Sequence, residues 1–239
     1  MRENKFDLQL FATKEIPKVE IRLEVKNETT DTADLFLYGS IRQSYWWDDE
    51  GSCISANGVR KSLESLKGKT VNIHINSPGG DVFESIAICN LLKQHDADIN
   101  IYIDAMAGSG ASLLATAGKN VYMFNNSMQM IHNAWTIASG NAAALRKTAD
   151  DLDKIDAAVK ASYMSRFVGT EDELTKLLAD ESYLTAAECL AFGLCTEIIE
   201  DKQEEEPPQN NIKTSLFAKY NKVPKEDGKK PSIFNAFKK

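Results

Sequence analysis

The fold of this chain is decided by the stretch DAMAGSGAS, residues 104–112. An alternating apolar run at residues 99–103 predicts a β-strand that ends where this stretch begins. Mostly apolar residues 113–117 then predict a buried helix that Gly118 ends. Ser109 therefore lies at a strand-to-helix turn, where unpaired N–H groups and the positive end of the helix dipole favour an oxyanion. An N-cap serine without a catalytic role is the commoner meaning of such a pattern.

Length and composition are those of an ordinary globular protein with one substantial core. The chain has 239 residues, of which 43% are hydrophobic and 26% charged. No apolar run is long enough to span a membrane, and residues 1–15 lack the pattern of a secretory signal. The four cysteines form no CxxC pair, and Cys89 and Cys189 fall in apolar helical patterns, which predicts core thiols. We therefore expect a cytoplasmic protein.

Charge and composition divide the chain into three parts. We predict an N-terminal arm at residues 1–15, a globular domain at residues 16–201 and a basic, disordered tail at residues 202–239. From Pro207 onward the tail holds eight lysines and two acids, a net charge of +6. Since the whole chain carries −7, residues 1–206 carry −13. The tail is therefore the part expected to attract an acidic partner or nucleic acid.

Strand and helix patterns alternate along the globular part, which predicts an α/β fold with mostly parallel pairing. Alternating apolar residues predict strands at residues 18–25, 34–41, 70–75, 99–103, 120–124 and 196–199. Helical spacing predicts helices at residues 55–66, 82–92, 113–117 and 142–167, and capping boxes open two more at residues 170 and 185. The helix at 142–167 is longer than one core face needs, so we expect it to contact other copies of the chain; the alternative is an ordinary core helix.

Three histidines are present, and His132 is the one best placed for catalysis. His74 alternates with apolar strand residues and His95 lies at a helix C-terminus, so both have structural explanations. His132 follows a strand-like run and precedes a loop, which leaves it free to act as the base that a nucleophilic Ser109 requires. The sequence holds no metal-ligand cluster, phosphate-binding loop or dinucleotide-binding glycine pattern, so we expect no metal and no cofactor.

A second glycine turn offers the other half of an oxyanion hole. Pro78, Gly79 and Gly80 follow a predicted strand, and the pattern predicts that the two glycines open the next helix. Backbone N–H groups at such a turn stabilise developing negative charge. We predict an oxyanion hole from the N–H groups of Gly80 and of Gly110, which follows the serine. The alternative is a tight turn that binds nothing.

Three motifs occur in a fixed order, namely INSPGG at residues 75–80, AGSGAS at residues 107–112 and MIHN at residues 130–133. Together they resemble the proteolytic subunit of the Clp protease (ClpP) family. The tryptophan pair at residues 46–47, in an acidic loop expected on the surface, and the longer run MIHNAW at residues 130–135 resemble its bacteriophage branch, the head maturation proteases. An alternative for the tryptophan pair is that one ring is simply part of the core.

The resemblance implies a ClpP/crotonase-like fold with repeated βα units and a protruding long helix, and a serine endopeptidase activity. Ser109 would attack the peptide carbonyl, and His132 would take its proton and pass it to the leaving amine. An acid beyond the long helix would orient the imidazole. Matching the family pattern without a gap places Glu181 there, and a shift of one residue selects Asp180. The alternative for both acids is a solvated charge at a helix end.

The resemblance also implies partners and a setting. Family members form homo-oligomers, with heptameric rings as the default, and act on protein substrates. For the phage branch these are capsid and scaffold proteins, cleaved in the cytoplasm of a bacterial host during head assembly. Because the chain carries no ATPase signature, we expect ATP-independent cleavage. Two alternatives stay open: a general peptidase that works with an ATPase unfoldase, which the tail and the tryptophan loop argue against, and a catalytically inactive assembly component, which the presence of Ser109 and His132 argues against.

Overall fold

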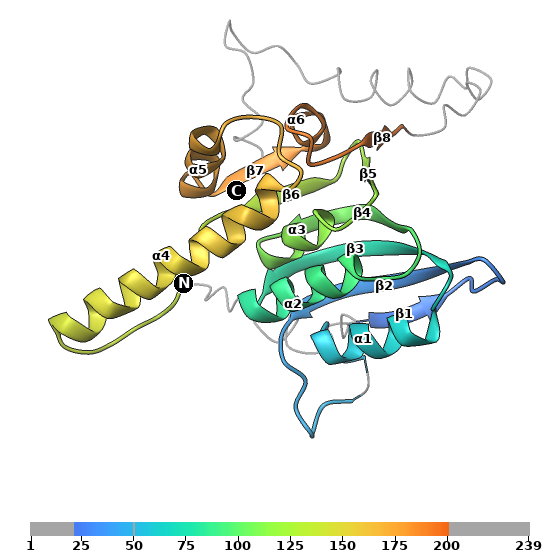
Figure 1. Cartoon of the computed structure of the whole chain (residues 1–239), viewed down its shortest axis with the longest axis horizontal. Coiled ribbons are helices and arrows are strands. Elements are labelled where there is room, and N and C mark those ends of the chain that lie inside the picture. Colours follow the sequence, from blue (N-terminus) through green and yellow to red (C-terminus); the bar gives the residue numbers. More distant parts are fainter. Residues whose placement is uncertain (1–21, 50, 201–239) are drawn as a thin grey trace, which may run out of the picture. The chain divides into compact units, whose positions relative to one another are not determined.

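Eight strands form one sheet in the computed structural model, which describes residues 22–49 and 51–200 (Figure 1). The strand order is β1-β2-β3-β4-β5-β8, and β6 pairs with β4 and with β7 beside this path. Pairing is parallel except in β1–β2 and β6–β7, so the predicted α/β fold with mostly parallel pairing is confirmed. The predicted arm at 1–15 and tail at 202–239 lie outside the described residues. The strands are β1 Arg22–Lys26, β2 Thr32–Ile41, β3 Thr70–Gly80, β4 Ile99–Gly108, β5 Asn120–Phe124, β6 Met128–Ile131, β7 Ser182–Thr185 and β8 Glu197–Ile199.

Six helices occur among the described residues, and five of them begin at a residue whose side chain accepts a hydrogen bond from the first turn. The two predicted capping boxes are confirmed at Thr170 and Thr185. No helix of the described part is both long and apolar enough to cross a membrane. The helices are α1 Ala56–Ser65, α2 Val82–Lys93, α3 Gly110–Ala115, α4 Ala142–Met164, α5 Glu171–Ala179 and α6 Ala186–Ala191.

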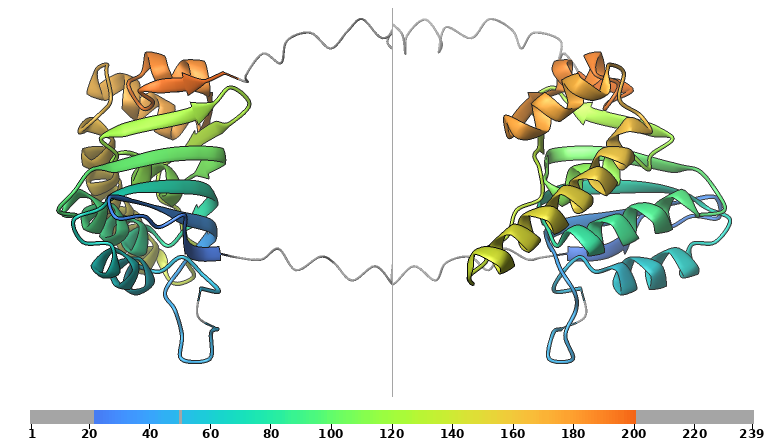
Figure 2. Two further views of the ribbon diagram at one scale, coloured as in Figure 1. Left: turned by 90° about the vertical axis from the view of Figure 1, so that its right-hand side faces the viewer. Right: turned by 60° about the vertical axis from the view of Figure 1, so that its left-hand side comes forward.

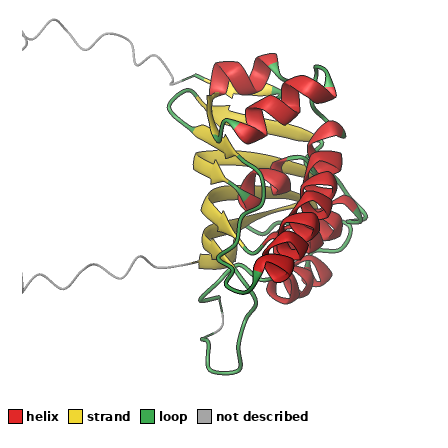
Figure 3. Ribbon diagram, turned by 90° about the vertical axis from the view of Figure 1, so that its left-hand side faces the viewer, coloured by secondary structure: helices red, strands yellow, loops and turns green. Residues whose placement is uncertain are grey.

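Apolar side chains alternate along the strands and fill the space between the sheet and the helices. In β2, β3 and β4, residues such as Leu35, Ile73 and Ile101 are fully buried, while the residues next to them are partly exposed. Figures 2 and 3 show the helices gathered on one side of the sheet, which is where this core lies. The predicted core thiols Cys89 and Cys189 are buried as well. Each fully buried aliphatic side chain contributes about 2 kcal/mol, so the core fixes the strand register that the site uses.

Two strands are longer than their sequence patterns predict. The apolar alternation stops well before Gly80 and Gly108, where the structure ends β3 and β4. Sheet partners explain the difference, because β2 pairs with the last residues of β3 and β6 pairs with the last residues of β4. The prediction that Gly79 and Gly80 open a helix is therefore wrong. Gly80 ends a strand, and Asp81 is the residue that caps α2.

Helix α4 protrudes from the sheet layer. Figures 1 and 2 show its first turns extending beyond the strands, and only Val159 and Tyr163, toward its end, are buried. Leu145, near its start, is 44% exposed. The predicted protruding helix is confirmed, although it ends at Met164 rather than at residue 167. A single chain thus leaves an apolar part of α4 uncovered.

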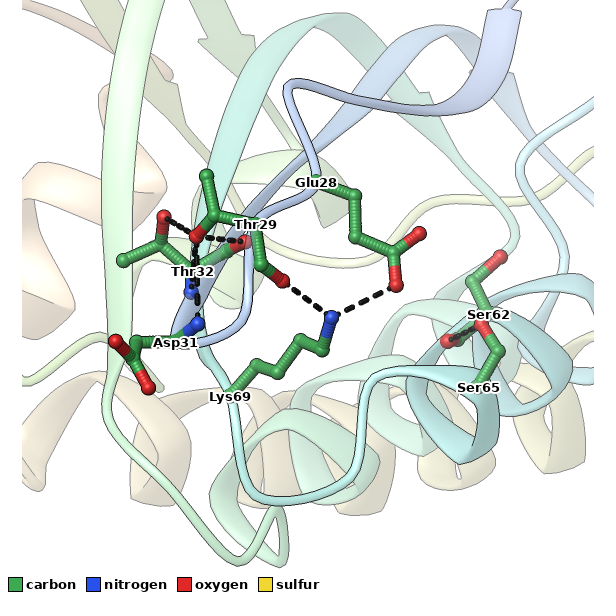
Figure 4. Close-up of polar contacts among 7 residues, drawn as sticks. All are labelled: Glu28, Thr29, Asp31, Thr32, Ser62, Ser65 and Lys69. Carbon is green, nitrogen blue, oxygen red and sulfur yellow. Dashed lines mark hydrogen bonds and ion pairs between the residues drawn. The ribbon is translucent and has the colours of Figure 1, made fainter.

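Polar contacts fasten the turn between β1 and β2 to the start of β3 (Figure 4). Thr29 Oγ1 accepts hydrogen bonds from the backbone N–H groups of Asp31 and Thr32. Lys69 Nζ donates to Glu28 Oε1 at 2.8 Å and to the carbonyl of Thr29. These contacts lie at the N-terminal ends of the parallel strands β2 and β3. The turn between β1 and β2 is therefore at the opposite edge of the sheet from the carboxyl ends of these strands.

The tryptophan pair lies in an exposed loop between β2 and α1, as the sequence predicts. Trp46 is 91% and Trp47 63% exposed, so the alternative that one ring belongs to the core is wrong. Arg42 forms a bidentate ion pair with Asp48, at 2.6 and 2.9 Å, that closes the loop. The hydrogen bond from the guanidinium lowers the pKa of Asp48 to about 2. Adjacent tryptophans beside acids in a surface loop predict a contact role for this loop.

Candidate active site

Ser109 and His132 form a hydrogen-bonded pair at the carboxyl ends of β4 and β6. Ser109 Oγ lies 2.7 Å from His132 Nε2. The parallel pairing of β4 with β6 brings the two residues together, because it aligns Gly108 with Met130. The backbone N–H of Ser109 also donates to Met130 O at 2.7 Å. Of the three histidines, His132 is thus the one that lies beside Ser109.

The hydroxyl group of Ser109 does not cap the helix that it precedes. Ser109 stands at the N-cap position of α3, yet its side chain accepts no hydrogen bond from the first turn, in contrast to the N-cap residues of the other five described helices. The hydroxyl is engaged with His132 instead. The interpretation of Ser109 as an ordinary N-cap serine is therefore wrong, and its hydroxyl is available for chemistry.

Ser109 adopts a strained backbone conformation, with φ at 50° and ψ at −124°. Such a conformation costs a non-glycine residue about 1–3 kcal/mol, so surrounding contacts must hold it in place. The carbonyl oxygen of Ser109 accepts from the backbone N–H of Ser112 at 3.0 Å and from Ser112 Oγ at 2.5 Å. Together with the bond from its N–H group to Met130 O, these contacts fix the turn with the side chain toward His132.

Gly80 and Gly110 lie next to each other beside the serine. A Cβ atom built on Gly110 would lie 3.6 Å from Gly80 N. Gly110 is the first residue of α3, where the helix offers no carbonyl partner for its N–H group. Gly80 ends β3, and the N–H of the next residue, Asp81, donates to Ile41 O of β2 at 2.9 Å. Two backbone N–H groups therefore lie close together beside Ser109, one of them from a strand end rather than from a helix start. Their role as an oxyanion hole stays a prediction.

A cavity of about 380 Å³ opens beside the serine–histidine pair. Ser109, His132, Gly80 and Gly110 are among its lining residues. Helices α3 and α4 contribute an apolar wall, made of Leu113, Leu152, Ile155, Val159 and Tyr163. A cavity with convergent polar groups and an apolar wall is typical of a ligand site, and here it has room for an apolar substrate side chain next to the hydroxyl.

Neither predicted acid forms a hydrogen bond with His132. Asp180 and Glu181 are exposed, and their carboxylates have no hydrogen-bond partner among the described residues. Nδ1 of His132 likewise meets no partner in the part of the chain that the structure describes. The register of the antiparallel β6–β7 pair aligns Ile131 with Ser182, so one further step places Glu181 opposite His132. The roles of both acids stay predictions.

The other two histidines, His74 and His95, make contacts that serve the fold. The His74 ring is stacked between Phe36 and Tyr102, and its Nδ1 lies 3.1 Å from both carboxylate oxygens of Asp104. His95 Nε2 lies 3.0 Å from the carbonyl oxygen of Lys69. Within residues 22–49 and 51–200, no three His, Cys, Asp or Glu side chains lie together as the ligands of a metal ion would.

Three polar side chains around the pair are not predicted by the sequence analysis. Ser112 Oγ lies 2.5 Å from Tyr163 Oη, and Asp156 accepts a hydrogen bond from the N–H of Ala134 at 2.7 Å, which fixes the loop after His132. Tyr163 and Asp156 both come from α4, far from the serine in sequence. In the helix predicted at residues 142–167, Tyr163 shares an apolar stripe with residues such as Ile155 and Val159, a pattern that indicates burial but not a polar partner.

The comparison with known protein families covers this whole region. A family model described as Clp protease matches residues 53–202, more than half of the chain. The matched part contains the serine–histidine pair, both glycines beside it and the strands from β3 to β8. Members of this family are peptidases, generally of the serine type, that act on protein substrates and form oligomeric rings. The fold and the serine–histidine pair agree with this match. The chain therefore belongs to the Clp protease family.

Proposed function

We propose that this protein is an ATP-independent serine endopeptidase in which Ser109 is the nucleophile and His132 the general base. The observation that carries the proposal is the 2.7 Å contact between Ser109 Oγ and His132 Nε2, beside two glycine amides and an apolar cavity. When its proton is on Nδ1, a neutral imidazole accepts the hydroxyl proton at Nε2. Membership of a peptidase family supports the same function.

In the proposed reaction, Ser109 Oγ attacks the carbonyl carbon of the scissile peptide while its proton passes to His132 Nε2. The N–H groups of Gly80 and Gly110 stabilise the oxyanion that forms. The imidazolium then gives its proton to the leaving amine, the C–N bond breaks, and an acyl-enzyme remains. A water molecule that the same histidine deprotonates releases the second product and restores the serine.

Labelling with a fluorophosphonate tests this proposal, because the reagent reacts with a serine that a neighbouring base activates. We expect mass spectrometry of the intact protein to show one adduct per chain and peptide mapping to place it on Ser109. His132→Ala should abolish the labelling, whereas His74→Ala, the matched control, should leave it unchanged. Wild-type protein that forms its oligomer but stays unlabelled would contradict the proposal and favour a catalytically inactive assembly component.

We also propose Glu181 as the acid that orients His132. The β6–β7 register supports it, because the ladder ends at the pair Ile131 and Ser182, and Glu181 is the residue next to Ser182 on the side of His132. Asp180 has a shorter side chain and lies one residue away from the opposite position, so it is the second candidate. A carboxylate at Nδ1 would hold the productive tautomer and stabilise the imidazolium.

Glu181→Gln is expected to lower kcat about 10³–10⁴-fold, because a neutral amide does not stabilise the imidazolium and favours the wrong tautomer. Asp180→Asn is the matched control and should change kcat by less than about twofold. Initial rates on a fluorogenic peptide measure both effects. The reverse pattern would select Asp180, and full activity in both variants would reduce the proposed triad to a Ser109–His132 dyad.

For the biological role we propose head maturation in a phage or prophage, with capsid or scaffold proteins as substrates in the host cytoplasm. The exposed tryptophan loop supports this role, because part of the resemblance to the phage branch rests on it. A maturation protease is expected to cut a flexible scaffold at a few defined sites without any ATPase, which mass spectrometry of the products would reveal. Degradation to short peptides that requires an added ATPase unfoldase would favour the general peptidase.

The protruding part of α4 is expected to join copies of the chain, and we propose heptameric rings. Light scattering should give a particle mass near a multiple of seven times the chain mass of 26.5 kDa. Leu145→Asp should lower that mass, because Leu145 is the exposed apolar residue near the start of α4. Lys154→Ala, at an exposed position on the same helix, is the control and should leave the mass unchanged. A stable, active monomer would contradict this proposal.

A further inference from the structure

One buried hydroxyl group contacts the carbonyl group of Ser109, and a second buried hydroxyl group contacts the first. Ser112 Oγ lies 2.5 Å from Ser109 O and 2.5 Å from Tyr163 Oη. Ser112 is fully buried and Tyr163 is only 1% exposed. Ser112 belongs to α3 and Tyr163 to the last turn of α4, so the contact joins two helices at the nucleophilic turn.

The number of protons sets the direction of these hydrogen bonds. A carbonyl oxygen only accepts, so Ser112 gives its single hydroxyl proton to Ser109 O. The second contact then requires Tyr163 to donate its phenol proton to Ser112 Oγ. Burial raises the pKa of Tyr163 well above its ordinary value, which keeps the phenol protonated for this purpose. The donors therefore run from Tyr163 through Ser112 to the carbonyl of Ser109.

The carbonyl of Ser109 belongs to the same peptide group as the N–H of Gly110. This group is planar and trans, so its C=O and N–H bonds point in opposite directions. A carbonyl held on the Ser112 side consequently fixes the direction of the Gly110 N–H. A hydrogen bond accepted by the carbonyl also polarises the amide and strengthens its N–H as a donor.

We propose that Ser112 and Tyr163 are positioning residues that aim and polarise the N–H of Gly110, one of the two donors of the oxyanion hole. The inference rests on the proposed serine endopeptidase function. Both hydroxyl groups act through the Ser109–Gly110 peptide and exchange no proton with the substrate. Because Tyr163 comes from α4, the helix that lines the cavity also sets the direction of this donor.

Tyr163→Phe and Ser112→Ala test the inference, since each removes one hydroxyl group with little change of shape. We expect kcat to fall about tenfold in either variant, a part of the loss that follows removal of an oxyanion-hole donor, while KM stays within about twofold. Affinity for a peptide boronate, which forms a tetrahedral adduct with the serine, should fall by the same factor as kcat. Thr116→Val is the matched control, because it removes another buried hydroxyl, one that donates to Leu113 O at 2.7 Å, and it should leave kcat unchanged.

The double variant separates positioning from stability. Ser112→Ala leaves the buried phenol of Tyr163 without an acceptor and lowers Tm, whereas adding Tyr163→Phe removes the unpaired group and restores part of the Tm. With a positioning role, kcat does not recover in the double variant. Recovery of kcat together with Tm, or unchanged kcat in all three variants, would overturn the inference. Wild-type protein without hydrolysis or labelling would instead overturn the serine endopeptidase function itself.

Discussion

Ser109→Ala is expected to lower the rate of peptide hydrolysis about a million-fold, the scale on which loss of the nucleophile acts in a serine triad. The substitution removes one oxygen atom and keeps Cβ, so the cavity and the backbone turn stay in place. The remaining turnover would come from substrate binding and from the N–H donors of Gly80 and Gly110. Initial rates on a fluorogenic peptide measure the loss, and the melting temperature checks that the variant is folded.

The backbone strain at Ser109 supplies a control for this prediction. Alanine keeps the strained φ of 50°, so the stability of Ser109→Ala should match that of the wild type. Glycine adopts a positive φ without a Cβ penalty. The free energy of unfolding of Ser109→Gly should therefore be about 1 kcal/mol higher than that of the alanine variant. An alanine variant that hydrolyses peptides at the wild-type rate would exclude Ser109 as the nucleophile. A glycine variant that is less stable than the alanine variant would show that the backbone of residue 109 is not strained.

The sequence predicts the presence of strands and helices better than it predicts where the strands end. Apolar alternation reflects contact of each strand with the core, so most elements of the α/β fold can be located from local pattern. The ends of β3 and β4 depend instead on pairing with β2 and β6. The sequence pattern predicts a helix start at Gly79 and Gly80, because no local pattern shows that a neighbouring strand pairs with these residues.

The same distinction applies to the site. Ser109 is recognisable from its small neighbours at a strand-to-helix junction, and His132 from the lack of another explanation for it. Ser112 and Tyr163 are 51 residues apart, and a hydroxyl in an apolar stripe gives no sign of its partner. The acid is hardest to predict, because neither Asp180 nor Glu181 forms a hydrogen bond with His132 in the structure, and no sequence pattern determines which side-chain conformation would bring a carboxylate to the imidazole.

Gly79→Ala is expected to have the other large effect, because this glycine packs directly against the nucleophilic turn. Its φ is 90°, a conformation that side-chain-bearing residues rarely adopt. A Cβ atom there would lie 2.4 Å from Gly108 O, 2.7 Å from Gly110 N and 2.9 Å from Ser109 Cβ. Two of these are backbone atoms that β4 and α3 hold, so the turn itself would have to shift. We expect a loss of more than about 3 kcal/mol in the free energy of unfolding.

Gly68→Ala is the matched control for this prediction. Gly68 also has a positive φ, 75°, but a Cβ atom built on it meets nothing within 4 Å. The substitution should therefore cost only the conformational penalty, about 1–2 kcal/mol. Urea unfolding at one fixed protein concentration measures both variants.

Fluorophosphonate labelling then reports what the substitution does to the site. In the folded fraction of Gly79→Ala, a displaced Gly110 amide should slow the labelling of Ser109, because the adduct places an oxygen in the oxyanion hole. Gly68→Ala should be labelled at the wild-type rate. Equal losses of stability in the two variants, with equal labelling rates, would mean that the close contact between β3 and the nucleophilic turn is not the reason for a glycine at residue 79.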